Sequence, residues 1–132
     1  MNIIKMAGCI ILKKDSILLI YRMKRDCYEL PGGKIDGEET PKETAKRELK
    51  EELSCEVEIL STVGSKAFTE DQRDFSYTWF LAKIKNGQTL KIGEPEIFSG
   101  FRYIPLNKLS SYKLSTNMQN LRSEIERGNI IL

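Results

Sequence analysis

Residues 33–55 read GKIDGEETPKETAKRELKEELSC, and this stretch decides the fold. Its second part predicts an amphipathic helix over Thr40–Leu53. Three apolar residues, Ala45, Leu49 and Leu53, recur every four positions and form one stripe. The start of the helix carries an N-cap threonine, a proline at the first helical position and a capping-box glutamate: Thr40, Pro41 and Glu43. The stretch therefore predicts a helix that packs one face against the rest of the domain.

Three glutamates of this helix share one sector of its surface. Glu48, Glu51 and Glu52 lie at positions i, i+3 and i+4, next to the apolar stripe. Like charges at this spacing repel each other, and a divalent cation would remove the conflict. Carboxylate oxygens are the ligands that Mg²⁺ and Mn²⁺ prefer. On these three residues alone, an ordinary acidic surface helix is the simpler interpretation.

The charge is distributed unevenly along the chain. Residues 34–58 contain nine acidic and five basic side chains, a local net charge of −4, whereas the whole chain carries +2. An acidic segment in a mildly basic protein suits a bound cation with an anionic small-molecule substrate nearby. A net charge this small gives no case for nucleic acid or an anionic membrane as a partner.

The residue types that are missing exclude several classes of enzyme. The chain contains no histidine, which excludes Ser-His-Asp and Cys-His catalysis and any histidine-bound metal. Its three cysteines, Cys9, Cys27 and Cys55, have no CxxC spacing, so neither a disulfide framework nor a zinc site is indicated. The apolar run Ala7–Leu12 is too short to span a bilayer, which needs about 20 residues. We therefore expect a cytoplasmic protein with no membrane partner.

The remaining pattern predicts a mixed α/β domain. Strands are expected at Ile3–Lys13, Ile17–Met23, Glu56–Phe68, Phe75–Lys85 and Phe101–Ile104, and a second helix at Ser115–Arg127. A short extended piece is expected at Tyr28–Leu30, a break at Pro31–Gly33, and loops at Thr69–Asp74 and Lys91–Gly100. We find no internal repeat or linker, so residues 1–132 are expected to form a single domain. The expected architecture is an α/β/α sandwich with a mixed β-sheet between helices.

The spacing within residues 33–55 resembles the signature of the Nudix hydrolases, and of their MutT-like members. That signature is a glycine, five residues, a glutamate, seven residues and then Arg-Glu-U-x-Glu-Glu-x-Gly-U, where U is a bulky aliphatic residue. The residues that match in type and position are Gly33, Glu39, Arg47, Glu48, Leu49, Glu51 and Glu52. The preceding Leu30–Lys34 also resembles the family's usual lead-in. Identity spaced over such a length is highly specific, and it implies the Nudix-type sandwich for nearly the whole chain.

Two residues at the end of the helix depart from the signature. Ser54 stands where the family has a glycine, and Cys55 stands where it has the last aliphatic residue. The glycine usually ends the helix in the left-handed conformation, which a serine adopts less easily, at a cost of roughly 1 kcal/mol. The conformation in which the helix ends is therefore in question. The glutamates that match the signature precede this point and are not affected.

The resemblance implies a magnesium-dependent hydrolase in which a metal-activated water attacks phosphorus in a diphosphate linkage. Mn²⁺ is a possible substitute for Mg²⁺. The implied metal ligands are three carboxylates and one backbone carbonyl, those of Glu48, Glu51, Glu52 and Gly32. Arg47 is implied to hold the glutamates in orientation through Glu39. The general base is either one of these glutamates or one from a later loop, where Glu94 and Glu96 lie.

Substrate recognition is encoded only weakly. Arg22 is a candidate phosphate contact and Tyr28 a candidate base-stacking residue, whereas Phe75, Tyr77 and Trp79 alternate at strand spacing, which favours core packing. We expect a nucleoside triphosphate or another nucleoside diphosphate derivative as substrate, and a monomer or homodimer. Two alternatives remain: a pyrophosphatase of ADP-ribose, sugar nucleotides or dinucleoside polyphosphates, and a non-catalytic nucleotide-sensing or interaction module, against which the intact glutamates argue. An isoprenoid diphosphate isomerase would need metal-binding histidines.

Overall fold

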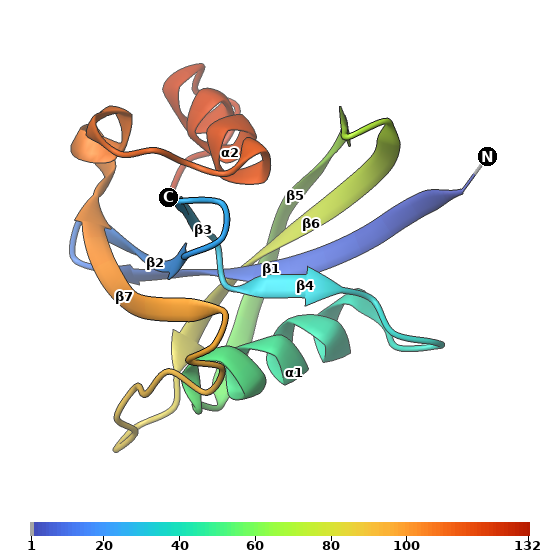
Figure 1. The fold of residues 1–132 in the computed structure, drawn as a ribbon. Coiled ribbons are helices and arrows are strands. Elements are labelled where there is room, and N and C mark those ends of the chain that lie inside the picture. The colour runs from blue at the N-terminus through green and yellow to red at the C-terminus, as the bar shows by residue number, and fades with distance from the viewer. Residues whose placement is uncertain (1) are drawn as a thin grey trace.

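The structure is a computed structural model that describes residues 2–132 (Figure 1). Its strands are β1 Ile3–Lys13, β2 Ser16–Arg22, β3 Cys27–Glu29, β4 Gly32–Lys34, β5 Val57–Glu70, β6 Arg73–Ile84 and β7 Phe98–Pro105. Its helices are α1 Pro41–Leu53, the short 3₁₀ helix η1 Leu106–Ser111 and α2 Thr116–Glu126. Within the described residues, no helix is long and apolar enough to cross a lipid bilayer.

Strand β1 organises a mixed sheet. It runs parallel to β6 over most of its length and antiparallel to β4 and to the start of β2. Strand β5 extends the sheet beyond β6, and β3 and β7 both pair with β2. The mixed sheet that the sequence predicts is therefore confirmed.

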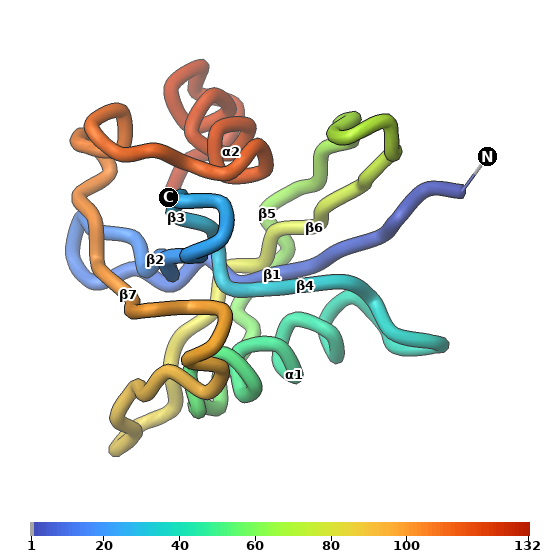
Figure 2. Tube along the Cα trace, in the orientation of Figure 1, coloured from blue at the N-terminus to red at the C-terminus, as the bar shows by residue number. Residues whose placement is uncertain are grey.

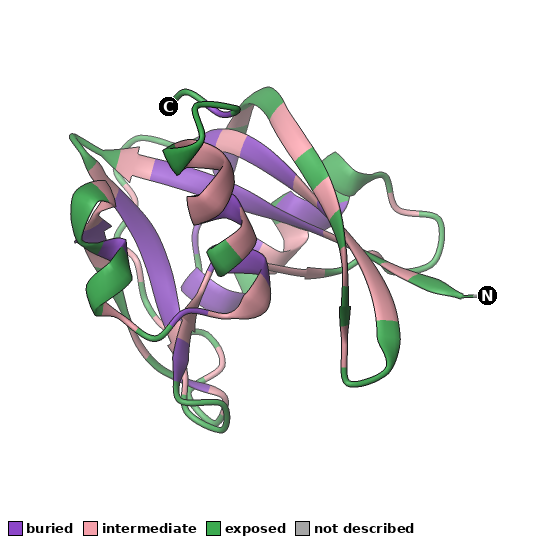
Figure 3. Cartoon of the chain, turned by 90° about the horizontal axis from the view of Figure 1, so that it is seen from above, coloured by how far each residue is buried: buried purple, intermediate pink, exposed green. Residues whose placement is uncertain are grey.

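The two main helices cover opposite faces of this sheet, as Figure 1 shows. Alternate residues of β1 belong to different hydrophobic clusters: Ala7, Cys9 and Ile11 pack with α1, and Ile10 packs with α2. The alternation follows from the two-residue period of a strand. Figure 3, seen from the side on which α2 lies, shows buried residues along the strands of the sheet. The expected α/β/α sandwich is confirmed.

Helix α1 has the ends that its sequence encodes. Thr40 Oγ1 accepts the backbone N–H of Glu43, and the Glu43 carboxylate accepts the backbone N–H of Thr40, so the capping box is complete. The predicted apolar stripe is fully buried. At the other end Ser54 adopts the left-handed conformation, with φ 56° and ψ 34°, and donates its N–H to the Lys50 carbonyl. Ser54 thus closes the helix in the conformation that glycine favours.

The expected loop at Thr69–Asp74 is wrong, because β5 and β6 continue through it. Thr69 pairs with Asp74 and Glu70 pairs with Arg73, which leaves a two-residue turn. Both turn residues, Asp71 and Gln72, have positive φ, 52° and 62°. Such turns match the twist of a hairpin but usually carry glycine or asparagine, so Asp-Gln gave no signal in the sequence.

Three further segments differ from expectation. The expected break at Pro31–Gly33 is partly wrong, because β4 is a short strand beside β1 that begins after Pro31. Strand β7 starts at Phe98 rather than Phe101, because its first residues pair with the end of β2 across a bulge. The 3₁₀ helix η1 lies in a segment to which the sequence pattern gave no element.

Candidate active site

A cavity of about 650 Å³ lies where β3, β4, α1, the β5–β6 hairpin and the start of α2 meet. One part of its wall is acidic and comes from α1 and the loop before β7, with Glu48, Glu52 and Glu94. Another part comes from the hairpin and α2, with Phe68, Phe75 and Asn117 among others. Two of the α1 glutamates that the sequence singled out therefore line one open cavity.

Glu52 is the most deeply buried carboxylate at the cavity, with 3% of its surface exposed. Its Oε1 accepts the backbone N–H of Gly32 at 2.9 Å. Burial and the neighbouring charge of Glu48 raise the pKa of Glu52 well above its ordinary value, and the hydrogen bond from Gly32 opposes this only in part. Glu52 is therefore a buried acid whose charge is not compensated by a cationic side chain.

Glu48 lies against the other glycine of β4. A Cβ on Gly33 would stand 2.5 Å from the carboxyl carbon of Glu48, so the glutamate occupies the space that a side chain would need. Burial raises the pKa of Glu48, Arg47 opposes the shift, and Glu51 adds to it. Gly33 thus leaves space for Glu48, and Gly32 donates its backbone N–H to Glu52.

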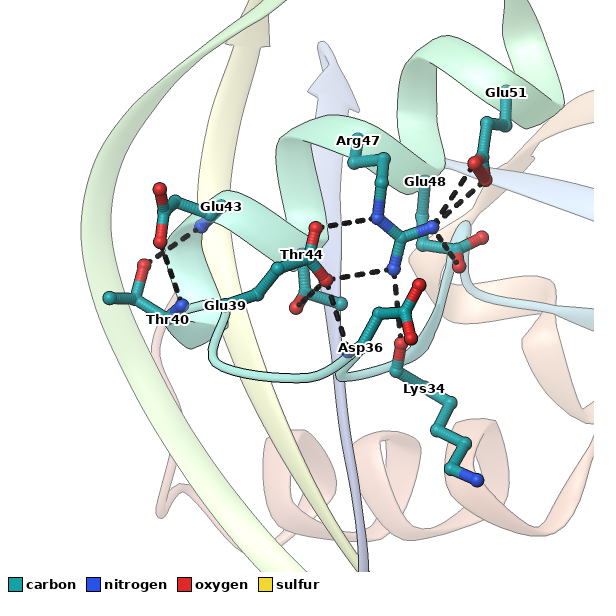
Figure 4. A network of polar contacts seen from close by, with 9 residues as sticks. All are labelled: Lys34, Asp36, Glu39, Thr40, Glu43, Thr44, Arg47, Glu48 and Glu51. Carbon is teal, nitrogen blue, oxygen red and sulfur yellow. Dashed lines mark hydrogen bonds and ion pairs between the residues drawn. The ribbon is translucent and has the colours of Figure 1, made fainter.

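Arg47 joins three glutamates in a network of charged hydrogen bonds (Figure 4). Its Nε and Nη2 donate to the carboxylate of Glu39 at 2.6 and 2.9 Å. Its Nη1 donates to Glu48 and Glu51, both at 3.0 Å, and Nη2 also reaches the Lys34 carbonyl at 3.1 Å. A planar guanidinium suits such a role because its donors form a rigid fork. The structure brings together all four of these charged residues of the sequence signature.

Glu39 is held from several sides. Besides Arg47, it accepts hydrogen bonds from the Thr44 hydroxyl at 2.9 Å and the Asp36 backbone N–H at 3.0 Å. These donors, Arg47 first, lower the pKa of Glu39 to about 2. Glu39 is not on the cavity wall. It therefore remains ionised and fixes Arg47 from outside the cavity.

The loop before β7 is attached to the C-terminal end of α1, beside which it passes in Figure 2. Lys91 donates its N–H to the Leu53 carbonyl at 3.0 Å, and Gly93 donates its N–H to the Glu52 carbonyl at 2.9 Å. These bonds satisfy carbonyls that a helix end leaves without partners. They also place Glu94 on the cavity wall, where burial and the charge of Glu51 raise its pKa. Glu96, the other candidate of this loop, is exposed and lies off the wall.

The two predicted substrate contacts have different surroundings. Arg22 lines the cavity, where it forms a bidentate ion pair with Glu29 at 2.9 Å and lies 4.9 Å from the Phe98 ring centre. Tyr28 is not on the wall and instead packs edge-on against Tyr21 and Tyr112. The structure therefore keeps Arg22 near the glutamates and leaves Tyr28 outside the cavity.

The sequence gave no signal for another polar group on the wall, the side chain of Asn117. The indole N–H of Trp79 donates to Asn117 Oδ1 at 2.9 Å, and Asn117 is 8% exposed. Because an indole can only donate, the amide nitrogen must point the other way and remains a donor. Phe68 and Phe75 stack on each other on the same wall, with ring centres 5.1 Å apart.

The acidic part of the wall suits a hard divalent cation. Carboxylate oxygens are the ligands that such an ion prefers, and the buried carboxylate of Glu52 has no ion-pair partner that would compete with it. Among residues 2–132, no group of three or more acidic or cysteine side chains lies close enough together to hold a metal ion. Glu51, which points to Arg47, is half exposed. The residue types at the cavity therefore fit a magnesium site, but Glu51 contacts Arg47 and is not on the cavity wall.

Comparison with known proteins identifies the family. The NUDIX domain model matches residues 4–125. An RNA pyrophosphohydrolase of Pseudomonas putida is 32% identical over a match that covers 79% of this chain and 80% of the relative. A MutT NUDIX hydrolase from Burkholderia pseudomallei has a similar structure, with a TM-score of 0.85, 21% identity and coverage of 95% of this chain and 99% of that one. A C. elegans Ap4A hydrolase superimposes with a TM-score of 0.76 and 19% identity, over 95% of this chain and 96% of the other. The chain belongs to the Nudix hydrolase family.

Proposed function

We propose that this Nudix hydrolase cleaves the diphosphate linkage of a nucleoside triphosphate or a related nucleoside diphosphate derivative, with Mg²⁺ as cofactor. The observation that carries the proposal is buried Glu52 beside Glu48 on a cavity wall. Glu48 is paired with Arg47, but Glu52 is buried beside it without an ion-pair partner, and an uncompensated buried carboxylate is costly in a protein. A divalent cation bound to a phosphate would provide this compensation.

The side chains divide the work by position. Glu48, Glu52 and the Gly32 carbonyl would hold the ion, with Glu51 as a further ligand once released from Arg47. When bound, Mg²⁺ would neutralise the phosphate oxygens and lower the pKa of a water molecule. Arg47, fixed by Glu39, orients Glu48. These residues prepare the site before the substrate arrives.

Glu94 is our candidate for the general base. Its carboxylate stands on the cavity wall, and burial and the charge of Glu51 raise its pKa, which makes it a stronger base. As the water oxygen forms its bond to phosphorus, Glu94 would take the proton. The bond between this phosphorus and the bridging oxygen would break, and the bridging oxygen would leave with the other phosphate group. Glu96 is further from this role because it is exposed and off the wall.

The rest of the wall favours a nucleotide over a bare polyphosphate. Phe68 and Phe75 present aromatic surface, and the amide nitrogen of Asn117 is a fixed donor for a carbonyl of a base. Arg22 lies close to the acidic part, where phosphates would sit. A second candidate substrate is the 5′-triphosphate end of RNA, because a relative at 32% identity is named an RNA pyrophosphohydrolase. Both candidates present the same kind of phosphoanhydride.

A hydrolysis screen tests the proposal. Nucleoside triphosphates, ADP-ribose, a sugar nucleotide, a dinucleoside polyphosphate and a 5′-triphosphorylated RNA are incubated with the protein, in Mg²⁺ and in EDTA. We expect turnover of at least one triphosphate in Mg²⁺ alone. Undiminished turnover after exhaustive EDTA treatment would contradict the metal requirement, and no turnover of any compound would favour the alternative of a non-catalytic module.

A further inference from the structure

Two glycines face each other where β1 meets β4. Gly8 of β1 is paired with Gly32 of β4. A Cβ on either glycine would collide with the hydroxyl oxygen of Tyr77, a residue of β6 whose side chain is almost fully buried. The phenol therefore reaches across β1 and ends in the space that two side chains would otherwise fill. Backbone oxygens are also close, since those Cβ atoms would stand 2.5 Å from the carbonyls of Pro31 and Ala7.

The Tyr77 hydroxyl thus packs against the peptide that holds the buried glutamate. Gly32 donates its N–H to Glu52 at 2.9 Å, and its own carbonyl is a proposed metal ligand. Tyr77 and Glu52 both line the cavity, and the charge of Glu52 is close enough to help burial raise the pKa of Tyr77. A shift of the Gly32 peptide would move the hydrogen bond that orients Glu52. The position of the Gly32 peptide therefore depends on the Tyr77 hydroxyl that packs against it.

We propose that Tyr77 is a positioning residue for the cation site: its hydroxyl fixes the Gly32 peptide, and through it the carboxylate of Glu52. This inference rests on the proposed function. It assigns a role to a side chain that strand alternation alone would count as core packing. Outer groups that orient metal ligands commonly change metal affinity by about 10–100-fold when they are removed.

The test is Tyr77→Phe, which removes the hydroxyl and keeps the ring. The matched control is Tyr103→Phe on β7, because Tyr103 is also partly buried and is not on the cavity wall. Mn²⁺ binding is followed by the electron paramagnetic resonance signal of the free ion, well below the melting temperature of each variant in EDTA. The melting temperature is then measured against Mg²⁺ concentration, and turnover is measured at saturating Mg²⁺.

We expect Tyr77→Phe to weaken Mn²⁺ binding about tenfold and to raise the Mg²⁺ concentration for half of the thermal shift by a similar factor. Tyr103→Phe should leave both unchanged. If Tyr77→Phe lowers the melting temperature equally in EDTA and Mg²⁺ with wild-type cation affinity, Tyr77 is core packing and the inference is wrong. If the wild type itself binds neither cation, the proposed function fails instead, so the two failures are distinguishable.

Discussion

Helices α1 and α2 cover opposite faces of one sheet, and the pKa values of their glutamates are shifted in opposite directions. On α2, Glu124 accepts hydrogen bonds from Lys66 at 3.2 Å and Asn129 at 2.7 Å, which lower its pKa. On α1, Glu48 and Glu52 lie at the cavity with raised pKa values. Both helices begin with a side-chain cap and bury an apolar stripe, so the difference is not one of helix quality.

The difference shows where the chain carries a local cost that its own residues do not remove. On α2, Glu124 finds its partners within the protein, which is what stability alone would select. On α1, Glu52 is buried beside Glu48 without an ion-pair partner, and the cation proposed for the site would offset this charge. Such a violation of the rules of stability is expected at functional sites. The following predictions test whether α1 and α2 differ in this sense, beginning with the largest expected effect.

Glu52→Gln should reduce turnover about a hundredfold or more, because the variant keeps an acceptor for Gly32 but loses a charged ligand. The control is Glu58→Gln, which alters an exposed ion pair with Lys83 on β5 and β6 and should keep wild-type turnover. Initial rates at saturating Mg²⁺ measure both. Wild-type activity in Glu52→Gln would remove the basis for treating α1 as the functional helix.

Glu94→Gln should lower the rate constant of turnover by about a hundredfold, the lower end of what a general base contributes. Glu96→Gln should have little effect, because that side chain is exposed and off the cavity wall. The two variants differ by one charge each in the same loop, so each is a control for the other. If Glu96→Gln is the slower enzyme, or if both variants retain full turnover, the assignment of the base to Glu94 is wrong.

Arg47→Lys should lower turnover about tenfold, with a smaller loss of stability. A lysine keeps the charge but cannot reach Glu39, Glu48 and Glu51 together, because it lacks the guanidinium fork. Turnover and thermal melting are measured in parallel with Arg122→Lys on α2, where half-buried Arg122 forms one long ion pair, at 3.6 Å, with exposed Glu126. Equal effects of the two substitutions would mean that the α1 network is an ordinary set of surface ion pairs.

How much of this the sequence predicted depends on the range of the interactions. Helix α1 was predicted from Thr40 to Leu53 because its capping box and apolar period are local. The box glutamates were named through their spacing, and the structure brings Glu48 and Glu52 to one cavity. Contacts set by strand register were not predictable, such as Tyr77 against Gly8 and Gly32, because residues distant in sequence meet there.

Two kinds of miss have separate physical causes. The turn at Asp71 and Gln72 was missed because neither residue is a glycine or an asparagine, the usual residue types at positions with positive φ. The donor on Asn117 was missed because its orientation is set by Trp79, 38 residues earlier in the chain. Ser54 was a departure from the signature, and it adopts the left-handed conformation all the same, helped by its bond to Lys50 and by the loop packed on the helix end.

In EDTA, the melting temperature should rise by a few degrees as the pH falls from about 7 to 5. The pKa values of Glu48, Glu52 and Glu94 are raised by folding, so the folded state binds protons before the unfolded chain does, and stability increases toward acid. Below about pH 4.5 the trend should reverse, because Glu39, with a pKa of about 2, stays charged when folded and the unfolded chain takes up the proton. A steady fall from pH 7 downward would contradict this.

The smallest effect separates α1 and α2 most directly, because it concerns stability without turnover. In EDTA, Glu52→Gln should melt about 2 °C above the wild type. The substitution removes the repulsion between Glu52 and Glu48, worth roughly 0.2–0.5 kcal/mol on a helix surface and more where the pair is buried. It also removes a charge from a side chain that is 3% exposed, while the hydrogen bond from Gly32 can remain.

In saturating Mg²⁺ the order should reverse, because the wild type gains about 2.7 kcal/mol at a hundredfold excess over its dissociation constant and the variant gains less. Glu124→Gln on α2 is the counterpart: it removes the charge that pairs with Lys66 and one of the two oxygens that accept from Lys66 and Asn129, and it should lower the melting temperature by the same few degrees in both buffers. If the sign of the melting difference reverses for Glu52→Gln and not for Glu124→Gln, the burial of Glu52 is compensated by a bound cation and not by other residues of the chain. If Glu52→Gln shifts melting equally in EDTA and Mg²⁺, its burial is only structural, and the contrast between the helices has no bearing on function.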